Sequence, residues 1–178
     1  MIVFMKTTIK VFEKTNDIVG YVVKYLLLLM AVCICIEVTG RYLLNSPTIW
    51  VYDVSRQLLG FMGALGGGYA FLYNAHVRVD VFYQKLSLKG RAILDIITSA
   101  VFFLFISVLL VQSINAAQLS WAIGERATTL LAPPLYYMKA AVAVGAFLVL
   151  IQGIAKLFRD ILIVVTGEDH TGKGMNYH

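Results

Sequence analysis

The stretch IITSAVFFLFISVLLVQSINAAQLSWAIG, residues 96–124, contains no charged side chain. A helix needs about 20 consecutive, mostly apolar residues to cross the hydrocarbon core of a membrane. Because this stretch is longer than that, it predicts a membrane-spanning helix, and the rest of the chain can be interpreted from it.

Three further windows lack charge. Residues 57–75 are long enough by themselves, whereas 25–36 and 140–155 reach the required length if flanking lysines extend to the membrane interface. The pattern predicts an all-α integral membrane protein with four transmembrane helices in one domain, residues 1–178. The expected spans are about 18–40, 56–75, 93–121 and 135–158, followed by a cytoplasmic tail, 159–178.

The composition supports this class. The chain is 60% hydrophobic and 14% charged, whereas an average soluble domain is about 25% charged. The first apolar run leads into Glu37, Gly40 and Arg41 without a signal-peptide cleavage site, so it is interpreted as a retained span.

The distribution of Lys and Arg predicts the orientation, because cytoplasmic loops carry the excess of both. Only four of the 15 lie in the connections 41–56 and 124–139: Arg41, Arg56, Arg126 and Lys139. We therefore expect both termini and residues 76–95 to be cytoplasmic. The net charge of +5 then reflects topology, and nucleic-acid binding is not expected.

The N-terminal segment has helical amphipathic spacing. Its apolar positions are Ile2, Met5, Ile9 and Phe12, and its basic positions are Lys6, Lys10 and Lys14. This spacing predicts a short helix lying on the anionic cytoplasmic surface of the membrane, with lipid as its partner. A frayed basic tail is the alternative.

Two groups of residues inside the spans predict contacts with protein. Gly63 and Gly67 form a G-x-x-x-G pattern, which lets two membrane helices approach closely. Gln112, Asn115 and Gln118 are expected to face protein rather than lipid, because lipid offers amides no hydrogen bonds. Hydrogen bonding between helices is the favoured interpretation, and a substrate path is the weaker one.

The sequence has few features of a catalyst or carrier. None of its three histidines falls inside an expected span, which disfavours haem, and no cofactor or metal site is expected in this chain. Cys33 and Cys35 are interpreted as thiols in an apolar helix. The ionisable group closest to a span interior is Glu37, and we expect it to form an ion pair with Arg41 at i+4.

Polar and aromatic residues gather in the connection RYLLNSPTIWVYDVSR, residues 41–56. Ser46 followed by Pro47 predicts a helix start and hence a short interfacial helix over 47–56. Trp50 suits the headgroup level, and Asp53 and Arg56 are spaced i, i+3. The connection is either an aromatic belt beside a solvated turn or a polar surface for a partner.

The run R-Y-x-x-N-S-P-x-x-W-x-x-D-x-x-R, beginning at Arg41, is followed one span later by H-V-R-V-D, residues 76–80. Their order resembles the small, DctQ-type membrane subunit of tripartite ATP-independent periplasmic (TRAP) transporters over essentially the whole chain. One departure is visible: the family often has two adjacent acidic residues where this chain has Tyr52 and Asp53.

The resemblance implies a non-enzymatic scaffold subunit in the bacterial inner membrane. Its partners would be a large multi-span subunit, which moves an organic acid with sodium, and a periplasmic substrate-binding protein. The interface residues implied are Arg41, Asn45, Trp50, Asp53, Arg56, Gly63, Gly67, His76, Arg78 and Asp80. Whether 41–56 meets the large subunit or the binding protein stays open.

Two other classes remain possible from the sequence. A small four-helix exporter working as a dimer would need Glu37 at mid-membrane as its proton-coupling residue. An anchor subunit of another membrane complex is the third class.

Overall fold

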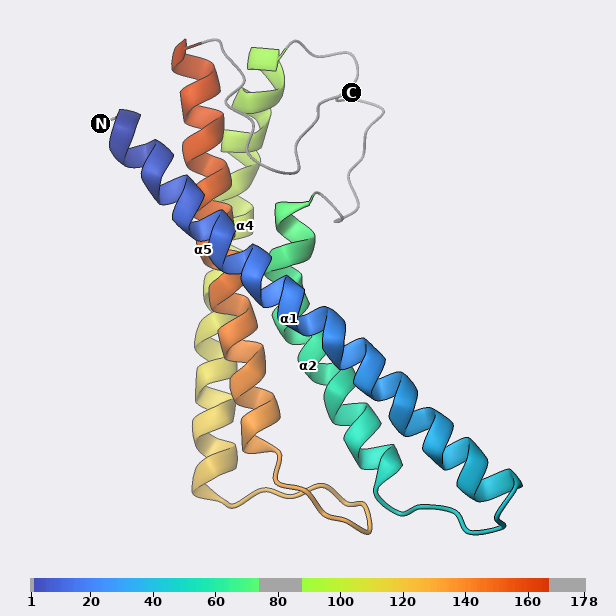
Figure 1. Ribbon diagram of the computed structural model, residues 1–178. Coiled ribbons are helices and arrows are strands. Elements are labelled where there is room, and N and C mark those ends of the chain that lie inside the picture. Colours follow the sequence, from blue (N-terminus) through green and yellow to red (C-terminus); the bar gives the residue numbers. More distant parts are fainter. Residues whose placement is uncertain (1, 74–87, 167–178) are drawn as a thin grey trace.

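The computed structural model describes residues 2–73 and 88–166. The helices in these ranges are α1 (Ile2–Tyr42), α2 (Val51–Leu72), α4 (Leu88–Ala122) and α5 (Tyr136–Thr166). Each runs antiparallel to the one before it, and the connections 43–50 and 123–135 are both at the lower end of the molecule in Figure 1. The predicted all-α class is confirmed for the described residues, where the only β-type pairing is the isolated bridge Arg126–Pro134.

Helices α1, α4 and α5 are long and apolar enough to cross a membrane, judged by length and composition. Helix α2 is not among them, because five glycines and its polar residues Asp53, Arg56 and Gln57 lower its hydropathy. Its 22 residues nevertheless extend about 33 Å at 1.5 Å per residue, which is about the thickness of the hydrocarbon core. A crossing by α2 stays a prediction.

The prediction of a separate short N-terminal helix is wrong, because α1 runs unbroken for 41 residues. Nothing between Thr15 and Ile18 interrupts the backbone, and the Thr15 hydroxyl donates to the Val11 carbonyl within the helix (2.9 Å). The apolar face predicted for lipid packs on protein instead: Ile9 is buried with Ala155 and Leu162 of α5. The segment is the N-terminal part of α1 rather than a separate helix.

The prediction of a short interfacial helix over 47–56 is also wrong. Helix α2 begins at Val51, its N-cap residue is Trp50, and no side chain caps it. Ser46 does not act as the cap, because α2 begins five residues after it. Its N–H donates instead to the Gly40 carbonyl (2.9 Å) at the end of α1. Residues 51–56 are therefore the first turns of α2.

Helix α5 is the centre of the molecule and packs against α4, α2 and α1. The lower halves of α1 and α2 diverge together from α4 and α5 (Figure 1). Small residues permit the contacts: a Cβ on Gly145 would collide with the backbone of Ala64, and one on Gly153 would collide with the ring of Phe102.

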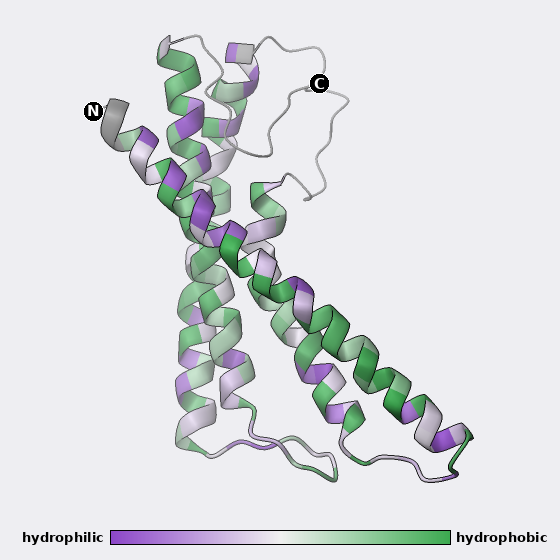
Figure 2. Ribbon diagram, in the orientation of Figure 1, coloured by the Kyte–Doolittle hydropathy of each residue, from purple (hydrophilic) through white to green (hydrophobic). Residues whose placement is uncertain are grey.

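Polar side chains occupy the point where α1 crosses α5. The Asn16 amide donates to Gln152 Oε1 (3.0 Å) and to the carbonyl of Leu148 (3.4 Å), and both polar side chains are fully buried. Gly68 of α2 lies directly against Asn16. Figure 2 shows the contrast along α1: polar residues are frequent from its start to this crossing, and the lower half is mostly apolar.

Candidate interaction site

Glu37 organises the connection between α1 and α2. Its Oε1 lies 2.5 Å from Arg41 Nη2, which confirms the expected i, i+4 ion pair. Its Oε2 accepts from the backbone N–H of Thr48 (2.9 Å) and from the Thr48 hydroxyl. Glu37 therefore ties the end of α1 to residue 48. The role of Thr48 was missed because no helical spacing links it to Glu37.

Asp53 and Arg56 do not form the pair that their spacing suggested, since no ion pair joins them in the described structure. Asp53 is 1% exposed, and its Oδ1 has no hydrogen-bond partner among the described residues. It faces α5, where it interacts electrostatically with Tyr137. Arg56 is exposed on another side of α2. The two side chains therefore lie in different surroundings, one buried and one exposed.

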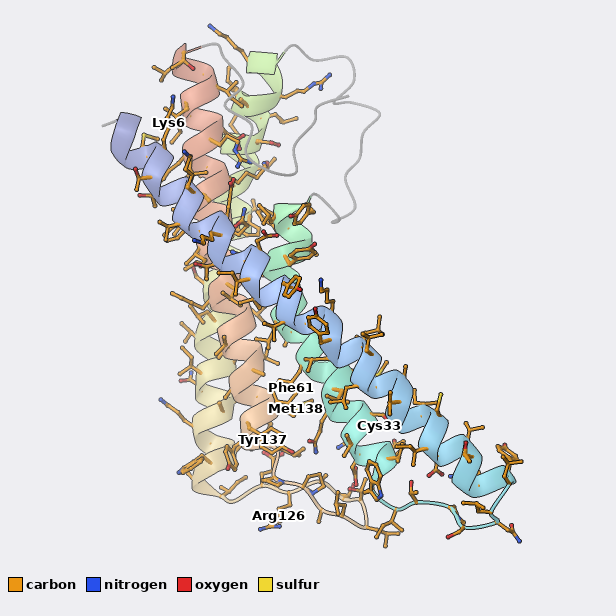
Figure 3. The ribbon with its side chains drawn as sticks, in the orientation of Figure 1. Lys6, Cys33, Phe61, Arg126, Tyr137 and Met138 are labelled. Atoms are coloured by element: carbon orange, nitrogen blue, oxygen red, sulfur yellow. The ribbon has the colours of Figure 1, made fainter. Side chains whose placement is uncertain are left out.

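Side chains labelled in Figure 3 join helices α2 and α5: Phe61, Tyr137 and Met138. The rings of Phe61 and Tyr137 stack with their centroids 6.1 Å apart. Met138 packs over Gly60, where a Cβ would collide with its methyl group. These contacts fix the face of α2 that carries Asp53 against the start of α5.

A groove of about 540 Å³ runs along the seam between α1 and α2. Met30, Ile34 and Leu59 provide apolar walls. The charged lining consists of Arg56 and the Glu37–Arg41 ion pair. The groove therefore offers a guanidinium and an apolar surface side by side.

The remaining predicted site residues are distributed differently. Asn45 is exposed and has φ 52°, a left-handed conformation that turns the chain after α1. Trp50 is 37% exposed next to the start of α2. A Cβ on Gly67 would lie 3.1 Å from Val149 Cγ2, but one on Gly63 would meet nothing within 4 Å. The other three predicted residues lie outside the described residues: His76, Arg78 and Asp80.

A second polar cluster, which the sequence analysis missed, joins the upper parts of α1, α4 and α5. Arg159 of α5 is fully buried and paired with Glu13 of α1. Lys156 lies 2.5 Å from Asp95 Oδ2 of α4 and 3.3 Å from Asp160 Oδ2. The sequence showed charges near the ends of predicted spans. Only the packing shows that they meet, as buried charges must.

The connection between α4 and α5 is also ordered by polar contacts. The Lys139 ammonium donates to Glu125, and this hydrogen bond is the main cause that lowers the pKa of the Glu125 carboxyl. The backbone N–H of Ala127 donates to the Pro133 carbonyl (2.9 Å). Arg126 lies at the lower end of the molecule in Figure 3, opposite Lys6.

The Glu37 carboxylate, five residues before the end of α1, is held by Arg41 and Thr48. The arrangement suits fixing helices and contacting a neighbour rather than chemistry.

Comparison with known families agrees with this architecture. Residues 30–162 match the family model described as "Tripartite ATP-independent periplasmic transporters, DctQ component". Since the match covers most of the chain, the protein belongs to the DctQ family of TRAP transporter small membrane subunits, which are transport components and not enzymes.

Individual relatives are named as small permease proteins of TRAP transporters. The chain is 30% identical over 134 residues to the ectoine TRAP transporter small permease protein TeaB of Halomonas elongata, covering 75% of this chain and 67% of TeaB. It is 26% identical over 122 residues to the sialic acid TRAP transporter small permease protein SiaQ of Vibrio cholerae, covering 68% and 69%. A shorter match, 38% identical, spans 45% of a relative from Haemophilus influenzae.

Proposed function

We propose that this small permease subunit is a scaffold in a sodium-coupled TRAP transporter for organic acids. In this proposal it stabilises the large membrane subunit, which carries the sodium and substrate sites, and helps a periplasmic binding protein to dock. The names of SiaQ and TeaB, which refer to sialic acid and ectoine, support a small organic solute as the cargo.

The observation that carries the scaffold role is the state of Glu37. A proton-coupled exporter needs a carboxylate that can exchange protons at mid-membrane. Glu37 instead lies near the end of α1 and holds Arg41 and Thr48. The buried charges Lys156 and Arg159 are likewise paired, with Asp95 and Glu13. Glu37, Lys156 and Arg159 thus serve structural contacts, which disfavours the exporter.

The proposed topology has four crossings, with both termini in the cytoplasm of a bacterial inner-membrane protein. It is supported by the antiparallel order of the four described helices and by the scarcity of Lys and Arg in 41–56 and 124–139. The connections 43–50 and 123–135 would then face the periplasm, where Arg56 and the seam groove are available to a partner.

Reconstitution in liposomes tests the function. Under an inward sodium gradient, with sialic acid and ectoine as probes, the small subunit alone should give no uptake. Protein copurified with the large subunit and supplied with the binding protein should give uptake for the cognate solute. Sodium-driven uptake by the small subunit alone would contradict the scaffold role. The large subunit with the binding protein, but without this chain, measures how much the scaffold contributes.

A further inference from the structure

The outward face of α4 changes character along its length. One side of the helix packs inward, where Ile106, Ser113 and Ser120 are buried. On the opposite side the upper half of α4 presents large exposed apolar side chains, including Val101 and Leu104, which are 72% and 69% exposed. The lower half of the outward surface instead presents three exposed amides: Gln112, Asn115 and Gln118.

These amides do not have the protein contacts that the sequence predicted for them. No side-chain hydrogen bond is formed by Gln112, Asn115 or Gln118 within the described residues, whereas the nearby Ser113 hydroxyl donates to the Leu110 carbonyl (2.9 Å). At 1.5 Å per residue, Asn115 lies about 10 Å and Gln112 about 15 Å inside the end of α4 at Ala122. Lipid at that depth offers no partner for an amide, so leaving Gln112 and Asn115 exposed to it is unfavourable.

The spacing of the amides fits a neighbouring helix. Positions i, i+3 and i+6 lie along one of the ridges that pack into the grooves of another helix at a crossing angle of about 20°, the common geometry of membrane bundles. A transmembrane helix in that position would bring hydroxyl, amide or backbone groups along the row of amides. An acyl chain in the same position would bring only methylene groups.

We propose that the lower part of the outward face of α4, at Gln112, Asn115 and Gln118, binds a transmembrane helix of the large TRAP subunit through hydrogen bonds between the helices. This inference rests on the function proposed above and assigns the contact to one surface. The chain belongs to a family of components of tripartite transporters, so its membrane neighbour is a different chain rather than a copy of itself. The apolar upper half of the same face is left to lipid.

Copurification with the large subunit tests the assignment. The triple variant Gln112→Leu/Asn115→Leu/Gln118→Leu should retain about tenfold less large subunit than wild type after detergent extraction and affinity capture. Its thermal unfolding in isolation should match wild type, because these side chains contact nothing that the isolated chain needs. The matched control Val101→Ile/Leu104→Ile/Val108→Ile alters the same face without removing a polar group, and should retain wild-type amounts.

Photocrosslinking identifies the neighbour directly. A benzophenone amino acid at position 115 should yield an adduct with the mass of the small and large subunits together. An adduct with a second copy of this chain, or full retention of the large subunit by the triple leucine variant, would overturn the inference. An equal loss in the isoleucine control would also overturn it, because shape rather than hydrogen bonding would then matter. Wild-type protein that fails to copurify would refute the proposed function itself.

Discussion

At the scale of single residues, the connection between α1 and α2 shows when the spacing of two charges along a helix is enough to predict an ion pair. Glu37 and Arg41 are spaced i, i+4 near the end of α1, and they pair as the spacing predicts. Asp53 and Arg56 have an equally plausible spacing, but α5 covers Asp53 and leaves Arg56 outside. The difference lies in the neighbouring helix, which the spacing within α2 does not reveal.

A charge swap at these two positions should therefore fail to restore stability. Asp53→Arg places a larger, unpaired charge at a site that is 1% exposed, and we expect it to destabilise the isolated subunit by about 3 kcal/mol or more. Arg56→Ala removes an exposed side chain and should change stability by less than about 0.5 kcal/mol. The double variant Asp53→Arg/Arg56→Asp should resemble Asp53→Arg alone.

Thermal and denaturant unfolding in one detergent provide the measurement, with Asp53→Asn as the control that keeps the side-chain shape. Wild-type stability in the swapped variant would show that the two charges need only each other. If Arg56→Ala leaves stability unchanged but weakens binding of the large subunit or the binding protein, Arg56 belongs to the interface.

At the scale of elements, the charge-free windows predicted helices α2, α4 and α5 well. The expected spans 56–75, 93–121 and 135–158 fall largely within Val51–Leu72, Leu88–Ala122 and Tyr136–Thr166. The helix ends differ because hydropathy marks where charge begins, whereas a helix ends where its backbone hydrogen bonds do. The predictions of separate helices at 2–14 and 47–56 were wrong for this reason. A change in polarity at 15–18 does not break α1, and Pro47 does not start α2.

The glycines of α2 and α5 are not equivalent as packing positions. Gly145→Leu should destabilise the isolated subunit by about 3 kcal/mol, because its side chain would meet the backbone of Ala64 rather than a movable side chain. Gly63→Leu should leave stability unchanged or slightly raised, because its side chain meets open space and glycine is a poor helix former.

Unfolding of both variants by the same method tests this contrast, and Gly67→Leu should fall between them because Val149 can shift. Equal destabilisation by Gly63→Leu and Gly145→Leu would contradict the packing described here. A stable Gly63→Leu subunit that no longer binds the large subunit would place Gly63 in the interface.

At the scale of the whole molecule, the crossing of α1 over α5 was beyond the sequence. It depends on Asn16, Gln152 and Gly68 meeting from three helices, and on Glu13 reaching Arg159. Each of these residues has an ordinary local explanation, such as a capping amide, a topology-setting cation or a small membrane-helix residue. Their shared function follows only from which helices are neighbours.

The same long-range arrangement makes the topology testable with two cysteines. Lys6 and Thr128 are exposed, and they lie toward opposite ends of the molecule, with α1, α2 and α4 between them along the chain. If all three helices cross the membrane, the two positions lie on opposite sides. If α2 does not cross, only two crossings separate them and they lie on the same side.

In a Cys33→Ala/Cys35→Ala background, which removes the two native thiols, a membrane-impermeant maleimide should label Thr128→Cys in cells whose outer membrane has been permeabilised. Lys6→Cys should react only after the inner membrane is opened, because the positive-inside rule places it in the cytoplasm. The reverse pattern would invert the proposed orientation while keeping four crossings. Labelling of both positions from the same side would show that α2 does not cross the membrane. Its low hydropathy would then be that of a helix that packs against α1 and α5 without crossing.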